Sequence, residues 1–313
     1  MVRSRILSTG SALPRKVVRN EDLAAEIDTT DAWITDRTGI CSRHIAGQEQ
    51  DTSDLATAAA RTALTSGRLA GSDLDLIVVG TITPDMVFPS TAALVQSRIG
   101  ASCVGAFDVS AACSGFVYAL ATADAIIRTG SVRKALVIGA DKMSKIVDPE
   151  DRATRVLFGD GAGAVVLEAC EEPGVVSIHL HADGSAPEQL NCALKGDFPY
   201  VRMQGGHVFR FAVRAMVEAA TEALAKNGLR VEDLAWFIPH QANRRIIEAA
   251  TRQLGIPSCK VVVTVSNHAN TSAASVPLAL DTAVRDGRIQ RGDNVLLVGV
   301  GGGFTWASAL IRW

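Results

Sequence analysis

Cys113 lies where an apolar segment runs into small residues and then into an alanine-rich stretch, in residues 108–116. This pattern predicts a turn at the start of a helix. The unpaired amide N–H groups and the dipole at a helix N-terminus stabilise a thiolate, so we predict that Cys113 is a nucleophile with a lowered pKa. The alternative is a buried, unreactive cysteine, which is the more common role for this residue type.

His240 and Asn270 occupy comparable places later in the chain. His240 follows the apolar residues 236–238 and begins a polar cluster with Gln241 and Asn243. Binding groups in parallel sheets lie beyond the carboxyl ends of the strands, which favours a functional histidine over a structural one. Asn270 belongs to a similar turn in residues 266–275, where helix capping is its alternative role.

Cysteine, histidine and asparagine together permit attack by a thiolate on an activated acyl group, with donors that stabilise the resulting oxyanion. The glycine-rich residues 299–303 would let backbone N–H groups approach a substrate closely. Neither this run nor residues 159–163 has the context of a P-loop or of a Rossmann G-x-G-x-x-G motif. The six histidines form no H-E-x-x-H set, so we expect neither a nucleotide site nor a metal site.

The elements that must position these residues alternate along the chain. Short apolar, β-branched runs at 77–79, 135–138, 164–167, 237–238 and 295–298 predict buried strands. Helix-forming stretches at 55–64, 116–127, 212–225 and 244–254 lie between them. Apolar residues make up 48% of the 313 residues, so the chain can bury a large core. We therefore predict an α/β fold.

Two halves of the chain resemble each other. Residues 73–80 align without a gap against 233–240, and the turn with Cys113 aligns with the turn that holds Asn270. Each turn precedes an alanine-rich helix, a glycine and an apolar strand. We interpret this as a duplication with a boundary near residue 170, giving halves 1–170 and 171–313.

Charge and cysteine content narrow the function classes. Lys and Arg number 31 and Asp and Glu 33, which argues against a nucleic-acid binder held by bulk charge. The apolar runs are too short to cross a membrane, and no signal-peptide pattern follows the N-terminus. Six scattered cysteines without a C-x-x-C pair are typical of a reduced, cytoplasmic protein.

Four motifs, in this order, resemble those of the β-ketoacyl-acyl carrier protein synthase III family: residues 108–116, 240–243, 270–275 and 301–306. The resemblance covers essentially the whole chain. It implies a thiolase-like fold, in which two similar α/β halves form a five-layered αβαβα body. It also implies a decarboxylating Claisen condensation of acyl-CoA with malonyl-acyl carrier protein, initiating fatty-acid biosynthesis, with no metal and no cofactor besides these substrates.

By the same resemblance, Cys113 carries the acyl group, while His240 and Asn270 donate hydrogen bonds to the malonyl thioester oxygen. The backbone N–H groups of Cys113 and Gly302 form the oxyanion hole for acyl transfer. CoA binding is assigned to Trp33, Arg37, Arg152 and Asn243, and carrier-protein binding to Arg210, Arg214, Arg244 and Arg245. Phe88 is expected to reach across a homodimer and close the partner's acyl pocket.

Two departures from the family pattern stand out. His268 and Ala269 replace an aromatic residue followed by glycine, and Arg155 adds a charge near the expected CoA mouth. They leave the starter acyl group open, with acetyl-CoA as the default. A polyketide- or quinolone-type condensing enzyme, a cysteine hydrolase and a non-catalytic CoA- or carrier-binding protein are the alternatives.

Overall fold

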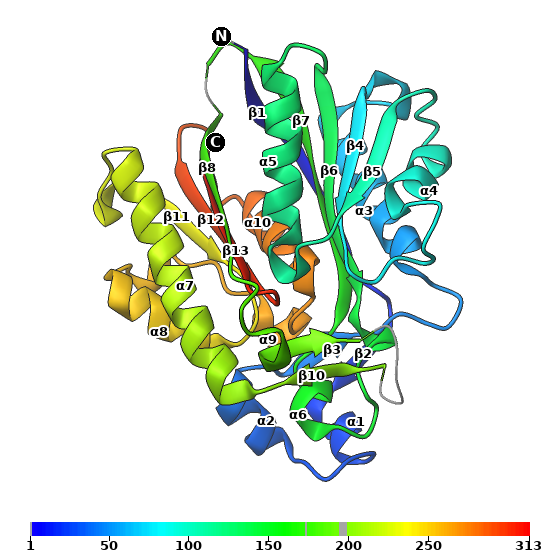
Figure 1. Ribbon diagram of the computed structural model, residues 1–313, viewed down its shortest axis with the longest axis vertical. Coiled ribbons are helices and arrows are strands. Elements are labelled where there is room, and N and C mark those ends of the chain that lie inside the picture. Colours follow the sequence, from blue (N-terminus) through cyan, green and yellow to red (C-terminus); the bar gives the residue numbers. More distant parts are fainter. Residues whose placement is uncertain (1, 173, 194–198) are drawn as a thin grey trace.

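Two β-sheets with a pair of helices between them form the centre of this protein (Figure 1). The computed structural model describes residues 2–172, 174–193 and 199–313. The first sheet has five strands in the order β1 (Arg3–Ala12), β7 (Asp160–Cys170), β6 (Lys134–Lys142), β4 (Leu76–Gly80) and β5 (Gly105–Val109). The second has the order β11 (Trp236–Pro239), β12 (Asn294–Gly301), β13 (Thr305–Arg312) and β8 (Val175–Ala182).

Both sheets are mixed, and each has parallel pairing at the edge that leads to a candidate site residue. β4 runs parallel to β5 and to β6, with Val78 opposite Phe107 and Val137. β11 runs parallel to β12, with Ile238 opposite Leu297. The remaining pairs within these two sheets are antiparallel. Parallel strands end at the same edge of a sheet, so the loops after β5 and β11 lie at ends where side chains can converge.

Helices fill the space between the sheets and cover both outer faces. α5 (Gly115–Arg128) and α10 (Ser275–Arg285) lie in the middle, α3 (Thr52–Gly67) and α4 (Thr91–Arg98) cover the first sheet, and α7 (Gly205–Lys226) and α8 (Arg244–Leu254) cover the second (Figure 1). One large buried apolar cluster surrounds α5 and α10 between the two sheets, and one lies between each sheet and its outer helices. The αβαβα order of layers is that of the predicted thiolase-like fold, which is confirmed.

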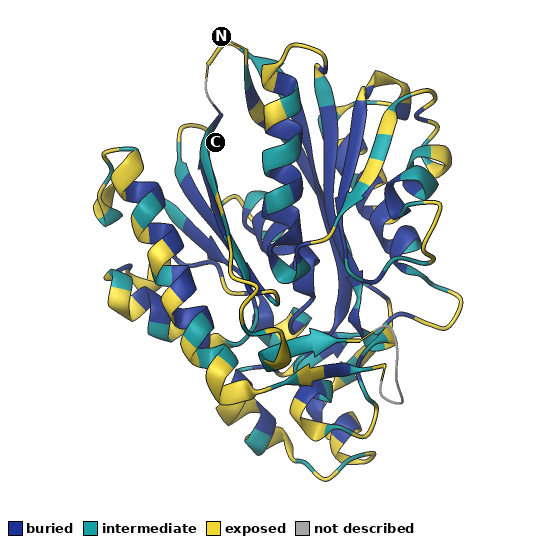
Figure 2. Ribbon diagram, in the orientation of Figure 1, coloured by how far each residue is buried: buried dark blue, intermediate teal, exposed yellow. Residues whose placement is uncertain are grey.

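The sequence pattern of the central and outer helices matches their burial. On α5, Phe116, Leu120, Ala123 and Ile127 recur at helical spacing and are all fully buried. The outer helices α7 and α8 instead have one buried face and one exposed face, so the two colours alternate along them (Figure 2). None of the helices in the described ranges is both long and apolar enough to span a bilayer.

Smaller elements gather at the lower end of the view in Figure 1. They comprise α1 (Asn20–Ala24), α2 (Asp31–Thr38), the paired strands β2 (Val17–Arg19) and β3 (Ser42–His44), α6 (Arg152–Arg155), and the paired strands β9 (Leu190–Cys192) and β10 (Val201–Met203). α9 (Val265–His268) leads into the turn with Asn270. These elements lie at the end of the molecule where the site opens.

The structure agrees with the alignment of residues 73–80 with 233–240, but it shifts the alignment of the two turns that precede α5 and α10. A 3-10 turn precedes β4 at Gly71–Asp73 and β11 at Val231–Asp233, as the ungapped alignment requires. A second pair of 3-10 turns, Ala112–Ser114 and Ser272–Ala274, leads into α5 and α10. When these two turns are aligned, Cys113 is equivalent to Ala273. The predicted equivalence of Cys113 with Asn270 is therefore wrong by three positions. The boundary near residue 170 remains our proposal.

Candidate active site

One cavity, of about 180 Å³, is lined by Cys113, His240 and Asn270. The three residues come from the turn before α5, the end of β11 and the turn before α10. Apolar side chains from α7 and from the loop before β13, including Phe211, line much of the remainder. The cavity therefore combines three convergent polar groups with an apolar interior, as binding pockets commonly do.

Cys113 sits in the 3-10 turn Ala112–Ser114, directly before α5, as predicted. The end of β12 passes against this turn so closely that a Cβ on Gly301 would lie 2.6 Å from the Cys113 amide nitrogen. Burial raises the pKa of the Cys113 thiol to about 12. The predicted lowering of this pKa is wrong, because the loss of water around a thiolate outweighs the stabilisation from the helix end.

Ser272 and Asp141 lie beside the nucleophile and were missed by sequence reasoning. The Ser272 hydroxyl acts to lower the pKa of Cys113, whereas the charge of Asp141 acts to raise it. Asp141 is fully buried and accepts hydrogen bonds from Thr81, from Thr83 and from the Ala273 amide. The position of Asp141 just after the apolar run 135–138 is a signal that could have identified it.

His240 is 3% exposed, and its Nδ1 lies 2.6 Å from the Ser275 hydroxyl oxygen. Among the described residues, Ser275 has no other acceptor for its O–H, whereas it receives a long hydrogen bond from the Gln241 amide. We therefore assign the tautomer in which Ser275 donates to Nδ1 and Nε2 carries the proton. Burial lowers the pKa of His240 to about 3, so the imidazole is neutral at pH 7 and presents an N–H donor.

The charge state of His240 leads to a pH prediction. Because its pKa lies at about 3, the neutral donor persists well below the ordinary histidine value of 6.5. Decarboxylation of malonyl-CoA, measured as released CO₂, should show no histidine titration between about pH 5.5 and 8. A loss of rate as the pH falls through 6.5 that disappears in His240→Ala would contradict the neutral donor.

Asn270 is held at both its backbone and its side chain. Its amide donates to the Leu157 carbonyl at 2.9 Å, and its carbonyl accepts from the Gly159 amide at 3.0 Å. The side-chain oxygen accepts from the Ser272 amide at 2.9 Å. Since that bond identifies the oxygen, the Nδ2 amide group is the part of Asn270 left to donate into the cavity.

Ala269, just before Asn270, adopts a backbone conformation that suits glycine. Its φ of 57° and ψ of −161° lie in a region that non-glycine residues rarely occupy, and the residue is fully buried. Alanine in place of glycine at this position therefore leaves the turn with a strained backbone.

Ala269→Gly should relieve that strain. Relief of about 1–3 kcal/mol exceeds the entropic cost of glycine, about 0.4–1 kcal/mol, so the free energy of unfolding should rise by about 1 kcal/mol. Urea unfolding followed by circular dichroism measures the change. Ala273→Gly is the control on the following turn, where destabilisation is expected, and a destabilised Ala269→Gly would contradict the strain.

Gly302 lies in the turn between β12 and β13. Its neighbour Gly301 lines the cavity with Cys113, whereas Gly302 packs against Leu190. The part of Gly302 in an oxyanion hole remains a proposal.

The four residues expected to bind CoA lie close together on α2, α6 and the start of α8. The guanidinium carbons of Arg37 and Arg152 each lie 4.7 Å from the centre of the Trp33 ring. Asn243 caps α8 by accepting from the Arg245 amide at 2.8 Å, and it donates to the Arg37 carbonyl at 3.1 Å. It also lines the cavity, so this cluster adjoins the pocket that holds Cys113.

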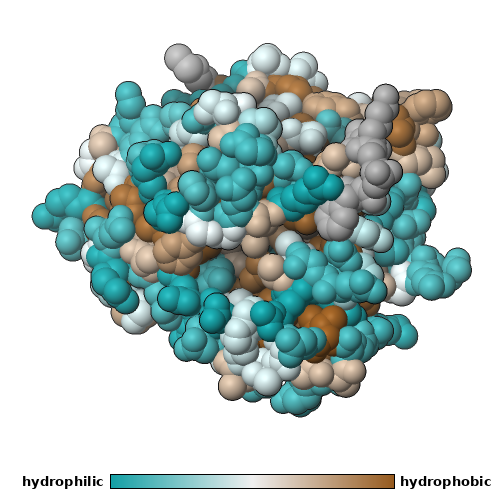
Figure 3. All heavy atoms as spheres, turned by 60° about the horizontal axis from the view of Figure 1, so that its bottom comes forward, coloured by the Kyte–Doolittle hydropathy of each residue, from teal (hydrophilic) through white to brown (hydrophobic). Residues whose placement is uncertain are grey.

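The four arginines expected to bind a carrier protein are all exposed, on α7 and α8. Arg214 and Arg244 pair with Glu218 and Glu248 on their own helices. No ion pair to Arg210 or Arg245 occurs within the described ranges. The end of the molecule near these helices is largely hydrophilic, with smaller apolar areas between the polar side chains (Figure 3).

Phe88 is 83% exposed and does not line the cavity of its own chain. Val87 beside it is 94% exposed. Two adjacent apolar side chains are thus directed into solvent in the single chain.

Comparison with known proteins identifies the family. The family model for 3-oxoacyl-[acyl-carrier-protein] synthase III matches residues 107–184, and the model for its C-terminal part matches residues 224–313. A β-ketoacyl-[acyl-carrier-protein] synthase III of Alkalilimnicola ehrlichii is 55% identical, with 100% of both chains covered. The chain belongs to the β-ketoacyl-acyl carrier protein synthase III family.

Solved structures agree with this membership. The crystal structure of 3-oxoacyl-[acyl-carrier-protein] synthase III from Aquifex aeolicus superposes with a TM-score of 0.95 at 47% identity, covering 99% of this chain and 100% of that one. A priming β-ketosynthase from a polyketide biosynthetic pathway also superposes with a TM-score of 0.95, at 39% identity, covering 99% and 96%. The predicted family and fold are confirmed.

No group of three or more His, Cys, Asp or Glu side chains in the described part of this family member is arranged to hold a metal ion. That it needs no metal and no cofactor stays a prediction.

Proposed function

We propose that this chain condenses a short acyl-CoA, by default acetyl-CoA, with malonyl-acyl carrier protein to give β-ketoacyl-acyl carrier protein, CoA and CO₂, the initiating step of fatty-acid biosynthesis. The observation that carries the proposal is the shared cavity of Cys113, His240 and Asn270. A binding protein has no need of a nucleophile and two donors in one apolar pocket.

In the first half-reaction, the Cys113 sulfur attacks the thioester carbonyl of acyl-CoA. The carbon–sulfur bond to CoA breaks, and CoA leaves with the thiol proton as its free thiol. Backbone N–H groups of Cys113 and Gly302 stabilise the oxyanion formed on the way. Because the pKa of the resting thiol is about 12, the proton must leave as the carbonyl is attacked rather than before.

In the second half-reaction, the malonyl group loses CO₂ and becomes an enolate. The His240 Nε2–H and the Asn270 Nδ2–H donate to the thioester oxygen, where the negative charge develops. The enolate carbon then attacks the acyl-cysteine carbonyl. A carbon–carbon bond forms, the bond to the Cys113 sulfur breaks, and the thiolate takes up a proton.

The proposal is tested by intact mass spectrometry after mixing with a panel of acyl-CoAs. A single acyl adduct is expected, and it should disappear when malonyl-acyl carrier protein is added and a β-ketoacyl carrier is formed. Loss of the adduct to water with free acid as the product would favour a cysteine hydrolase. Absence of any adduct and of any condensation would favour a non-catalytic CoA- or carrier-binding protein.

CoA is placed at Trp33, Arg37, Arg152 and Asn243. The Trp33 indole and the two guanidinium groups beside it are flat groups on which an adenine can stack, and the guanidinium groups can also bind phosphate oxygens. Asn243 continues this surface toward the cavity.

The carrier protein is placed on Arg210, Arg214, Arg244 and Arg245. Arg245→Glu should raise KM for malonyl-acyl carrier protein about tenfold and change KM for malonyl-CoA far less, because only the carrier offers an acidic protein surface. Steady-state kinetics with both substrates measures this. Arg252→Glu, exposed at the other end of α8, is the matched control. An equal rise for both substrates would remove the carrier surface.

A homodimer accounts for Val87 and Phe88, whose apolar side chains are 94% and 83% exposed in one chain. Phe88 would then close the acyl pocket of the partner subunit. A cytoplasmic location is proposed on the six cysteines, which are all free.

A condensing enzyme of specialised metabolism is the second candidate, favoured by the superposition on the polyketide priming synthase. The higher identity to the Alkalilimnicola ehrlichii protein favours the first. The acyl-CoA panel separates the two, because a specialised enzyme would prefer a starter other than acetyl-CoA.

A further inference from the structure

A second cavity, of about 220 Å³, lies between α1, the β2–β3 pair and residues 144–158. It is separate from the cavity with Cys113, although Phe158 contributes to the walls of both. The proposed reaction uses none of the other residues that line it. Its volume corresponds to roughly seven water molecules at liquid density, which is enough for a small organic ligand.

Arg43 places a buried positive charge in the wall of this cavity. The residue is 1% exposed, and its hydrogen bonds go to neutral acceptors: the Val18 carbonyl at 3.3 Å, the Asn20 side chain at 2.9 Å and the Val156 carbonyl at 3.1 Å. Its Nε is buried and has no partner in the described residues. Burial lowers the pKa of Arg43 to about 10, so the group is still charged at pH 7. A buried charge without an ion-pair partner is unfavourable, so an anion near it would stabilise the protein.

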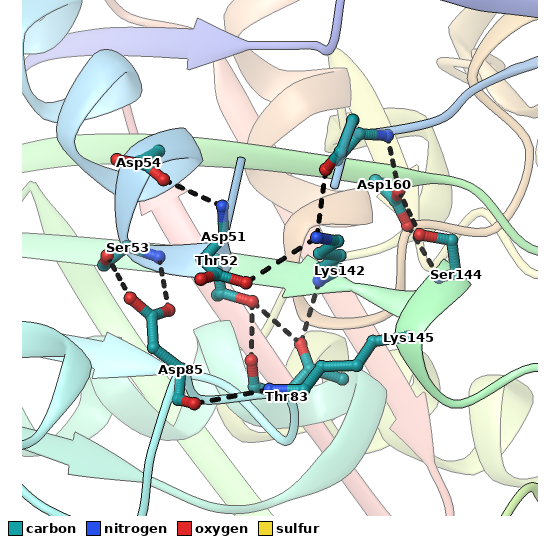
Figure 4. A network of polar contacts seen from close by, with 12 residues as sticks. Asp51, Thr52, Ser53, Asp54, Thr83, Asp85, Lys142, Ser144, Lys145 and Asp160 are labelled. Carbon is teal, nitrogen blue, oxygen red and sulfur yellow. Dashed lines mark hydrogen bonds and ion pairs between the residues drawn. The ribbon is translucent and has the colours of Figure 1, made fainter. Parts of the chain in front are cut away.

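Glu26 lines the cavity, Asp160 binds its lining residue Ser144, and Asp22 is near enough to raise the pKa of Arg43. All three carboxylates are already engaged, Asp22 by the Arg19 amide. Glu26 pairs with Arg155 at the edge of the cavity. Asp160 accepts from the amide and hydroxyl of Ser144 and from a second backbone amide (Figure 4). None of the three carboxylates forms an ion pair with Arg43 in the described part of the chain.

The lysine side chains near the cavity differ in whether they have partners within the protein. Lys142 is bound to the Gly47 carbonyl and to Asp51, and Lys145 to the Pro84 and Asp85 carbonyls (Figure 4). Lys16, by contrast, lines the cavity and is exposed, and no side-chain partner of it occurs in the described residues. Arg43 and Lys16 therefore leave the cavity with an excess of positive charge.

Apolar side chains form much of the remaining wall, beside Glu26, Ser144 and Arg155. Val18, Leu23, Ile45, Val147 and Phe158 face the same space, and Leu23, Val147 and Phe158 are buried. An inorganic anion would leave these side chains against water, whereas an aliphatic chain would cover them. The cavity thus suits a ligand with one anionic end and one short apolar end.

We propose that this cavity is a binding site for a short-chain aliphatic carboxylate. The carboxylate accepts a hydrogen bond from Lys16 and is attracted by the buried charge of Arg43, and the chain packs on the apolar side chains of the wall. A hydrogen bond from an ammonium group to a carboxylate is charge-assisted and is therefore stronger than one between neutral groups. The site goes beyond the proposed condensation, because it contains neither Cys113 nor His240 nor Asn270.

Isothermal titration calorimetry with butyrate tests the site on the full chain. One equivalent of butyrate should bind, and Lys16→Ala should weaken binding about tenfold. Arg15→Ala removes a neighbouring exposed charge that does not line the cavity and is the matched control. Val147→Trp fills the second cavity and should abolish binding, whereas Val208→Trp fills the cavity with Cys113 and should leave it intact.

Lys16 is exposed, so its replacement tests the site even if Val147→Trp fails to fold. Absence of binding at millimolar butyrate, or loss of binding in Val208→Trp alone, would overturn the proposal. Equal binding of inorganic phosphate would overturn the aliphatic part of the ligand. Equal binding of butylammonium would overturn the role of charge.

Discussion

Cys113→Ser is expected to reduce acyl transfer from acyl-CoA to the protein by at least about 10⁴-fold. A serine hydroxyl fits the space of the thiol but is a far weaker nucleophile without a base. The structure offers it none, because the assigned His240 tautomer points an N–H donor, and not a lone pair, into the cavity. Intact mass after incubation with radiolabelled or unlabelled acetyl-CoA measures the adduct directly.

The control for this experiment separates the nucleophile from the other thiols. Cys41, Cys103 and Cys259 are exposed, and an adduct on them would survive in Cys113→Ser. Cys103→Ser should therefore keep the full adduct. Retention of a stoichiometric adduct in Cys113→Ser, mapped to any other residue, would refute the nucleophile.

Asn270→Ala is expected to lower malonyl decarboxylation by about 10²–10³-fold, as the loss of one oxyanion donor does in other enzymes. Formation of the acyl-enzyme should change by less than about tenfold, because that step uses the backbone donors near Cys113. The Asn270 side chain is oriented by the Ser272 amide, so its Nδ2 group is the donor that the alanine removes.

The two half-reactions are measured separately, acylation by intact mass and decarboxylation by release of CO₂ from malonyl-CoA. Asn267→Ala, at an exposed position on α9, is the matched control and should change neither rate. An equal loss of both half-reactions in Asn270→Ala would contradict the division of roles. If both rates fell because the variant is less stable, its free energy of unfolding would also be lower than that of the wild type.

The alignment of the two halves shows where sequence reasoning reached its limit. The alignment correctly makes β4 equivalent to β11, since both strands follow a 3-10 turn and both are apolar. The alignment of the turns before α5 and α10 is wrong by three positions. Short turn segments have no hydrophobic periodicity that would reveal an insertion.

The prediction of a lowered pKa for Cys113 is wrong for a related reason. Its place at the start of a helix is a local property and was predicted correctly. Its surroundings are the packed ends of β12 and α10 with the carboxylate of Asp141, which are distant in the chain. Desolvation depends on these neighbours, so no local pattern could have predicted the direction of the pKa.

The hydrophobic period of the sequence predicts the α/β fold class, and the resemblance carried by four short motifs predicts the layers, the family and the candidate catalytic residues. These depend on hydrophobic period and on short motifs, which act within a few neighbouring residues. The folded molecule alone shows which atoms of His240 and Asn270 donate, how Ala269 is strained, and that Arg43 is buried beside a partly apolar cavity. The contacts of His240 and Arg43 join segments far apart in the chain, and the packing of the whole molecule sets such contacts. The bond to Asn270 and the backbone of Ala269 are local, but a turn without hydrophobic periodicity does not reveal them.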